Sequence, residues 1–200
     1  VETKNNILKI FIENTNYYKK MDTSKLLVTV SNPGIGSVTV SSSATFSIKN
    51  NLNVSLLKIN TSSSADFSGT VTCNSIFIDA SSSSNVALNM ATDDIAVNLS
   101  SSSSVALKGK TDNLAIDASS SADCDAKELI SNMAQVSAST SSDVHVLALK
   151  GLDATASTSG SIKYYGKLDK KLHGQNIILD FNDYGTTDKE FAYDFLYDII

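Results

Sequence analysis

The stretch that decides the fold is SIFIDASSSSNVALNMATDDIAVNLSSSSSVALKGKTDNLAIDASSSADC, residues 75–124. Apolar and polar side chains alternate in it, as in Ile76-Phe77-Ile78-Asp79-Ala80, and a run of serines follows each alternating segment. Alternation of period two is typical of β-strands, because successive side chains point to opposite faces. Both features return after 19 residues, so the stretch predicts a repeat of strands and serine-rich corners.

The repeat extends in both directions from this stretch. Serine runs separated by 21, 19, 19, 19, 20 and 18 residues begin at Ser41, Ser62, Ser81, Ser100, Ser119, Ser139 and Ser157. Four columns of equivalent positions keep the same register. The first column is Phe46, Phe67, Val86, Val105, Cys124, Val144 and Ile162; the second is Leu57, Ile76, Ile95, Leu114, Ala134 and Leu152. The third is Ile59, Ile78, Val97, Ile116, Val136 and Ala154; the fourth is Val40, Thr61, Ala80, Leu99, Ala118, Ala138 and Ala156.

One spacing in the repeat is constant and another varies. Six residues always separate a member of the fourth column from the next member of the first, whereas the first and second columns are 11, 9, 9, 9, 10 and 8 residues apart. A random low-complexity tract would not keep one gap fixed while the other changed. We therefore expect a rigid, stacked corner at the serines and an opposite corner that tolerates insertions.

The length of the unit selects the architecture. Nineteen residues are too few for a propeller blade, which needs about 40, and the units lack the spacing and the helical segment of leucine-rich repeats. The remaining architecture is an all-β solenoid of 6–7 coils of 18–21 residues, in which each coil pairs in parallel with the next at about 4.8 Å. The inward columns would then form one continuous core.

The serine runs fit the predicted stack as a corner of small residues. Stacked serines can hydrogen-bond between coils, and Asn60, Asp79, Asn98 and Asp117 would form a polar ladder beside them, which helps to fix register. A regular hydroxyl array could instead bind an ordered surface such as ice or a glycan, although the T-x-T pattern associated with ice binding does not recur from coil to coil.

The flanks divide the chain into three predicted parts. Residues 1–35 contain two predicted strands, Ile7–Glu13 and Leu26–Val30, that lead into the first coil, and residues 36–165 form the repeats. Residues 166–200 contain a predicted strand at 176–181 and an aromatic segment, 184–200. This last part is expected to cap the open end of the solenoid; alternatively, its aromatic residues could stack on sugar rings or contact a partner.

Composition excludes several classes of protein. The net charge is −5, all 16 basic residues are lysine, and no basic cluster is present, which argues against nucleic acid as a partner. No run of 18 apolar residues predicts a transmembrane helix. Cys73 and Cys124 make no disulfide scaffold, and they are expected to be unbridged because they lie three coils apart. The sequence begins at Val1 without a leader, so we expect any signal peptide to lie outside it.

The coils resemble a known family. The segments Ser62–Phe67, Ile76–Ser81 and Asn113–Asp123 resemble the recurring "dnLxIxxsGsgdv" coil of the "putative auto-transporter adhesin, head GIN domain" family. Upstream, Asn6–Ile10 and Val28–Ala44 resemble its opening motifs, so that the likeness covers about residues 5–166. The chain departs from the family in having serines at the corner glycines and in lacking the opening strands that precede residue 1.

The resemblance implies a right-handed, single-stranded parallel β-helix. It also implies export to the envelope of Gram-negative bacteria, at the cell surface, in the periplasm or anchored to the outer membrane, often behind a lipoprotein or secretory signal. It implies no catalytic residues and no cofactor.

One cluster of outward residues could carry chemistry. Stacking brings Asp123, Asp125, Asp143 and His145 together on two adjacent coils, with two carboxylates about 5 Å apart, a separation that suits a retaining glycosidase. Three carboxylates could also bind calcium. No groove-forming loop, tryptophan or arginine accompanies them, so we interpret this acidic patch as solvated surface, with an exposed charge pair between His145 and Asp125. We therefore expect no catalytic, cofactor-binding or metal-binding residues.

Three classes of function remain open. The first is a non-catalytic surface module with an adhesive or structural role, whose partner is an unidentified surface, glycan or protein ligand. The second is a glycan-binding or carbohydrate-active β-helix protein. The third is an envelope scaffold that self-associates weakly through the ends of the solenoid.

Overall fold

The computed structural model describes residues 2–4, 7–11, 27–31, 34–166 and 177–180. They belong to two compact units, residues 1–31 and 32–200. Every regular element among the described residues is a β-strand. In the first unit, β1 (Glu2–Lys4) pairs antiparallel with β2 (Ile7–Lys9).

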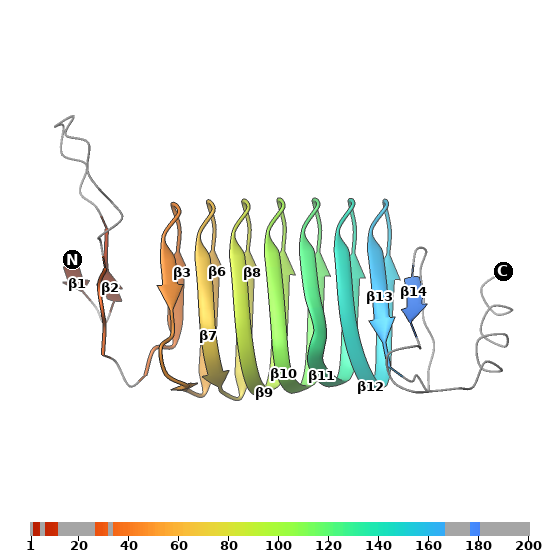
Figure 1. Cartoon of the computed structure of the whole chain (residues 1–200), viewed down its shortest axis with the longest axis horizontal. Coiled ribbons are helices and arrows are strands. Elements are labelled where there is room, and N and C mark those ends of the chain that lie inside the picture. The colour runs from red at the N-terminus through yellow and green to blue at the C-terminus, as the bar shows by residue number, and fades with distance from the viewer. Residues whose placement is uncertain (1, 5–6, 12–26, 32–33, 167–176, 181–200) are drawn as a thin grey trace, which may run out of the picture. The chain divides into compact units, whose positions relative to one another are not determined.

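The second unit contains the remaining strands. They are β3 (Ser37–Val40), β4 (Thr45–Ser47), β5 (Leu52–Asn53), β6 (Leu56–Thr61), β7 (Asp66–Thr72), β8 (Ser75–Ala80), β9 (Asn85–Leu99), β10 (Ser104–Ala118), β11 (Asp123–Ala138), β12 (Asp143–Ala156), β13 (Ser161–Tyr165) and β14 (Ile177–Asp180). All of these strands pair in parallel, each with its equivalent in the neighbouring coil. They form a β-solenoid of about seven turns (Figure 1), which confirms the predicted fold.

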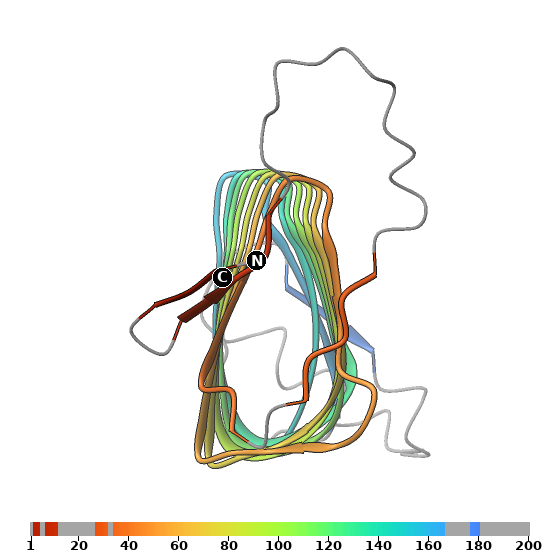
Figure 2. The same cartoon turned by 90° about the vertical axis from the view of Figure 1, so that its left-hand side faces the viewer.

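The predicted register is confirmed rung by rung. Val86, Val105, Cys124 and Val144 are successive partners in the first column. In the third column, Ile59 pairs with Ile78 and so on through to Ala154. Viewed along the stack, the coils lie one behind another (Figure 2). The alternation read from the sequence therefore assigns the inward and outward residues correctly.

The serine corner is a tight turn that recurs in each coil. Its two central residues have positive φ, from Ser42 (59°) and Ser43 (59°) to Thr158 (47°) and Ser159 (62°). The amide of the fourth turn residue donates to the carbonyl of the first, as from Ser103 to Ser100 at 3.2 Å. Positive φ at both central positions defines a type I′ turn, whose usual residues are asparagine and glycine. Serine, and threonine at 140 and 158, therefore occupies turn positions that usually hold asparagine or glycine.

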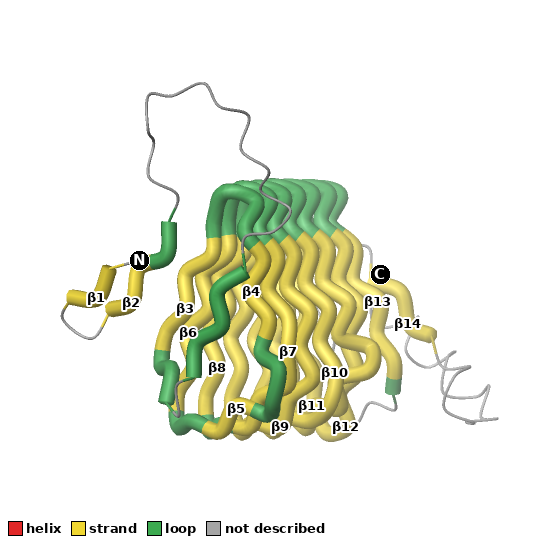
Figure 3. The backbone as a smooth tube through the Cα atoms, turned by 60° about the vertical axis from the view of Figure 1, so that its left-hand side comes forward, coloured by secondary structure: helices red, strands yellow, loops and turns green. Residues whose placement is uncertain are grey.

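Neighbouring turns are bonded to each other through their backbones. In six successive turns, the amide of the second positive-φ residue donates to the carbonyl of the first such residue in the next coil, at 2.9 to 3.1 Å, for example from Ser83 to Ser101. Three buried serines, Ser84, Ser103 and Ser142, donate their hydroxyls to carbonyls of the preceding coil. The stacked turns form the continuous ridge seen in Figure 3.

The opposite corner absorbs the variation in coil length. Strands β9 to β12 each run through it without a break, from one turn to the next. The pairing of β10 with β11 shifts between Ala106 and Lys108, where the gap grows from 9 residues to 10. The pairing of β11 with β12 shifts twice, where the gap falls from 10 residues to 8. These two length changes are taken up as β-bulges, whereas the two extra residues of the first coil fall in the break between β4 and β5.

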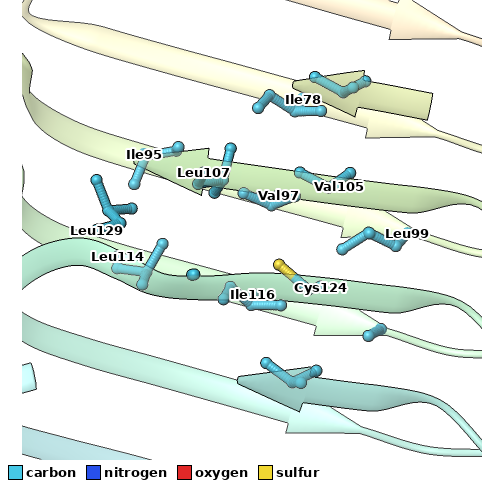
Figure 4. Close-up of a cluster of buried hydrophobic side chains, with 14 of the residues drawn as sticks. Ile78, Ile95, Val97, Leu99, Val105, Leu107, Leu114, Ile116, Cys124 and Leu129 are labelled. Atoms are coloured by element: carbon cyan, nitrogen blue, oxygen red, sulfur yellow. The ribbon is translucent and has the colours of Figure 1, made fainter. Parts of the chain in front are cut away.

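The core consists of the stacked inward columns. Its side chains are almost entirely apolar and interdigitate between coils; those labelled in Figure 4 are Ile78, Ile95, Val97, Leu99, Val105, Leu107, Leu114, Ile116, Cys124 and Leu129. Near the first coil, the rings of Phe46 and Phe67 stack 5.2 Å apart. Near the last, Tyr164 is fully buried and its hydroxyl donates to the carbonyl of Ala148 at 2.7 Å. Both cysteines are buried and unbridged, as predicted.

The flanks agree with the sequence only in part. The strand predicted at Leu26–Val30 is wrong for its described residues, because 27–31 pair with no described strand, and an apolar run becomes a strand only where a backbone partner exists. The strand predicted at 176–181 is confirmed as β14, which pairs in parallel with β13. Residues 167–176 and 181–200, including the aromatic segment 184–200, lie outside the described residues. The division at residues 35 and 165 stays a prediction.

Among the residues described, no helix is long and apolar enough to span a bilayer.

Core truncation tests the register of the stack. Ile116 is 3% exposed and stacks between Val97 and Val136. We expect Ile116→Ala to lower the free energy of unfolding by about 2–5 kcal/mol, measured by denaturant titration. Asp117→Asn, one position along and outward, is the control and should change it by less than about 0.5 kcal/mol. Equal, small effects of the two substitutions would show that the alternation is inverted.

Substitution at a turn tests the left-handed backbone. Ser102 has a φ of 59°, a region that glycine adopts freely and β-branched residues avoid. We expect Ser102→Val to lower the free energy of unfolding by about 1–2 kcal/mol, and Ser102→Gly to be the more stable of the two variants. Ser104→Val, at an exposed position of strand β10, is the control and should be tolerated. If Ser102→Val were as stable as Ser104→Val, the turn would not have positive φ.

Candidate functional site

The solenoid has two outward faces beside the ridge of turns. The post-turn face is formed by β4, β7, β13 and the first halves of β9 to β12, and it carries the predicted acidic patch. The pre-turn face is formed by β3, β6, β8 and the second halves of β9 to β12.

The stack brings the four predicted residues of the acidic patch together. Cys124 and Val144 point into the core, at 2% and 0% exposure, so their chain neighbours must point outward. Asp123 is the register partner of Asp143, and Asp125 is the partner of His145. The predicted two-by-two arrangement is therefore present on β11 and β12.

The charge pairs inside the acidic patch differ from the prediction. His145 Nε2 lies 3.8 Å from Asp143 Oδ2, on its own strand, rather than pairing with Asp125. Asp125 instead accepts a hydrogen bond from the backbone amide of Lys127 at 3.3 Å and pairs with its ammonium at 3.2 Å. Residues two apart on one strand share a face, so local pairs compete with pairs across coils. The side-chain hydrogen bond from the exposed Lys127 ammonium to Asp125 raises the pKa of that ammonium.

Aromatic and basic side chains border the acidic patch. The imidazole of His145 meets the ring of Tyr165 edge to face, with centroids 5.9 Å apart. Lys163 Nζ lies 5.2 Å from the centroid of the same ring. Sequence reasoning did not include Lys127 and Tyr165 in this patch. The alternation along β11 places Lys127 on the same face as Asp125, so Lys127 could have been predicted from the sequence.

Beneath the acidic patch lies a shielded thiol. Burial, with a smaller contribution from Asp125, raises the pKa of Cys124 to about 12. Burial also raises the pKa of Cys73, partly offset by its contact with Thr92 at 3.6 Å. Neither thiol therefore has the lowered pKa that marks an activated nucleophile.

The outward side chains do not converge on a metal-binding point. Side chains on stacked parallel strands point in parallel, and within the described part of the chain no group of three or more His, Cys, Asp and Glu residues is arranged to hold an ion. Asp125 already pairs with the Lys127 ammonium, and Asp143 lies beside the His145 imidazole. What the arrangement offers is a row of polar groups on a flat sheet.

The polar ladder of the pre-turn face has the predicted register. Asn60, Asp79, Asn98 and Asp117 are successive partners. The same face carries Phe77, which is 48% exposed. Sequence reasoning placed Ile76 and Ile78 inward and assigned no role to the residue between them, although the same alternation points it outward.

These features define a β-solenoid repeat protein with flat, mostly polar outer faces. The chain belongs to the family described as "Putative auto-transporter adhesin, head GIN domain", whose model matches residues 1–167. This confirms the family indicated by the coil motifs. No match was found among curated proteins or among solved structures. The family's description indicates an adhesin-like head domain at the cell surface or outside the cell.

Removal of charge tests whether the acidic patch is a site or ordinary surface. We expect Asp123→Asn and Asp143→Asn each to change the free energy of unfolding by less than about 0.5 kcal/mol, because both side chains are exposed. Millimolar calcium should leave the melting temperature of the wild type unchanged, as measured by thermal unfolding. A calcium-dependent rise in melting temperature that the double variant abolishes would identify an ion site instead.

Proposed function

We propose that the chain is a non-catalytic, extracytoplasmic β-solenoid module that presents its flat faces to a ligand at the cell surface. The observation that carries the proposal is the match of the head-domain family over residues 1–167, which include every coil through β13. Further support comes from the turns, which are bonded from coil to coil and make the stack a rigid platform. Such a platform holds outward side chains at fixed spacing and suits contact with an extended ligand.

Surface labelling and adherence test this function. Antibodies against the chain should label intact cells of the source organism, and protease added outside should remove the label. Display of the chain on a non-adherent host cell should increase adherence in proportion to the number of copies displayed, compared with display of Ile116→Asp, which disrupts the core. Label that appears only after the inner membrane is disrupted would contradict the location, and adherence equal to that of Ile116→Asp would contradict the role.

A carbohydrate-active enzyme is the second candidate. One observation favours it: Asp123 and Asp143 are register partners on adjacent coils, at the strand spacing of about 5 Å that suits a retaining mechanism. Against it, Asp143 is paired with His145 on an exposed sheet. Incubation with plant and mucin polysaccharides should release no reducing ends. Release that Asp123→Asn abolishes would establish catalysis.

A further inference from the structure

The pre-turn face has a shallow groove lined by polar side chains and one aromatic ring. Its outward residues are Lys58, Asn60, Phe77, Asp79, Ala96 and Asn98, drawn from β6, β8 and β9. The register fixes their layout as two adjacent rows across three coils. Lys58, Phe77 and Ala96 form one row, and Asn60, Asp79 and Asn98 form the other.

The neighbours of the Phe77 ring differ between the preceding and the following coil. Ile76 and Ile78, each 1% exposed, hold the backbone of β8 against the core, so Phe77 stays outward and half-exposed. Lys58 Nζ lies 5.9 Å from the ring centroid, on the side of the preceding coil. On the other side the register partner is Ala96, followed by Ala115. The small alanines leave that side of the ring free to receive a ligand.

The polar row beside the ring has unused hydrogen-bonding capacity. Elsewhere in the solenoid, Asp and Asn on adjacent coils bond to each other: Asn85 with Asp66 at 2.9 Å, Asn113 with Asp94 at 2.8 Å and Asn132 with Asp112 at 2.7 Å. Among the described residues, no such bond engages the side chains of Asn60, Asp79 and Asn98. Two amides and a carboxylate therefore lie in a row with donors and acceptors facing solvent.

From this combination we infer that the groove is a subsite for a neutral pyranose unit of a glycan. The C–H face of a sugar ring would pack on Phe77 over Ala96, and its hydroxyls would bond to Asn60, Asp79 and Asn98. The lining holds one positive charge, on Lys58, and one negative charge, on Asp79, which cancel at neutral pH and favour an uncharged ligand. Polar residues recur at one per coil, about 4.8 Å apart, so that a glycan lying along the stack meets a new partner at each step.

This inference rests on the proposed function and names the ligand class of the surface module. Its test is a nuclear magnetic resonance titration of the full chain with methyl glucosides, galactosides and mannosides and with cello-, xylo- and galacto-oligosaccharides. At least one sugar should cause saturable shifts in the amides of β6, β8 and β9. Phe77→Ala should weaken that binding by about tenfold, or 1.4 kcal/mol, whereas Phe77→Tyr, which keeps the ring, should retain it.

The matched control is Leu149→Ala, which shortens another half-exposed apolar side chain, 50% exposed and outside the groove; it should bind as wild type. Asn98→Ala should weaken binding without changing stability. If no sugar in the panel gives saturable shifts at these strands, or if Phe77→Ala binds as tightly as wild type, the inference is overturned. Adherence of the displayed chain does not require Phe77 in particular, so the surface role could survive that failure.

Discussion

A single backbone hydrogen bond, repeated at every turn, sets the register of the solenoid. The amide of one positive-φ residue donates to the carbonyl of the first positive-φ residue in the next coil. Such a bond forms only when consecutive turns have the same shape and lie directly above one another. This requirement explains why six residues always separate a member of the fourth column from the next member of the first. Once the turns are aligned, the strands on both sides pair in parallel and the apolar columns meet.

The turn imposes a conformational cost that the stack offsets. A residue with a side chain in the left-handed region costs about 1–2 kcal/mol, and each coil has two of them. Serine adds no bulk at this ridge, so each turn can approach its neighbours closely enough to bond. At the fourth position of the turn, buried serine hydroxyls reach the preceding coil. The serine-rich composition is therefore a consequence of stacking geometry.

Most of the architecture could be predicted from the sequence because it depends on periodicity. The four columns, the rigid corner and the position of the acidic patch all follow from alternation and spacing. Features that depend on a partner far along the chain could not be predicted in this way. The run at 26–30 has strand composition, but its described residues, 27–30, have no pairing partner among the described strands. His145 had two carboxylates within reach, of which it contacts the one on its own strand. The alternation predicts that Phe77 points outward. The contacts of its ring could not be predicted in the same way, because they depend on the residues that stacking places in the neighbouring coils.

Burial of Cys124 has a consequence for the compartment in which such a chain can function. Thiol–disulfide exchange and oxidation to sulfenic acid both proceed through the thiolate. With a pKa of about 12, Cys124 is almost entirely protonated at neutral pH, and the surrounding core excludes oxidants. Both unpaired cysteines are buried, which is compatible with an oxidising environment, where exposed thiols would crosslink neighbouring molecules. The same packing that holds the coils together therefore shields Cys124 from thiol chemistry.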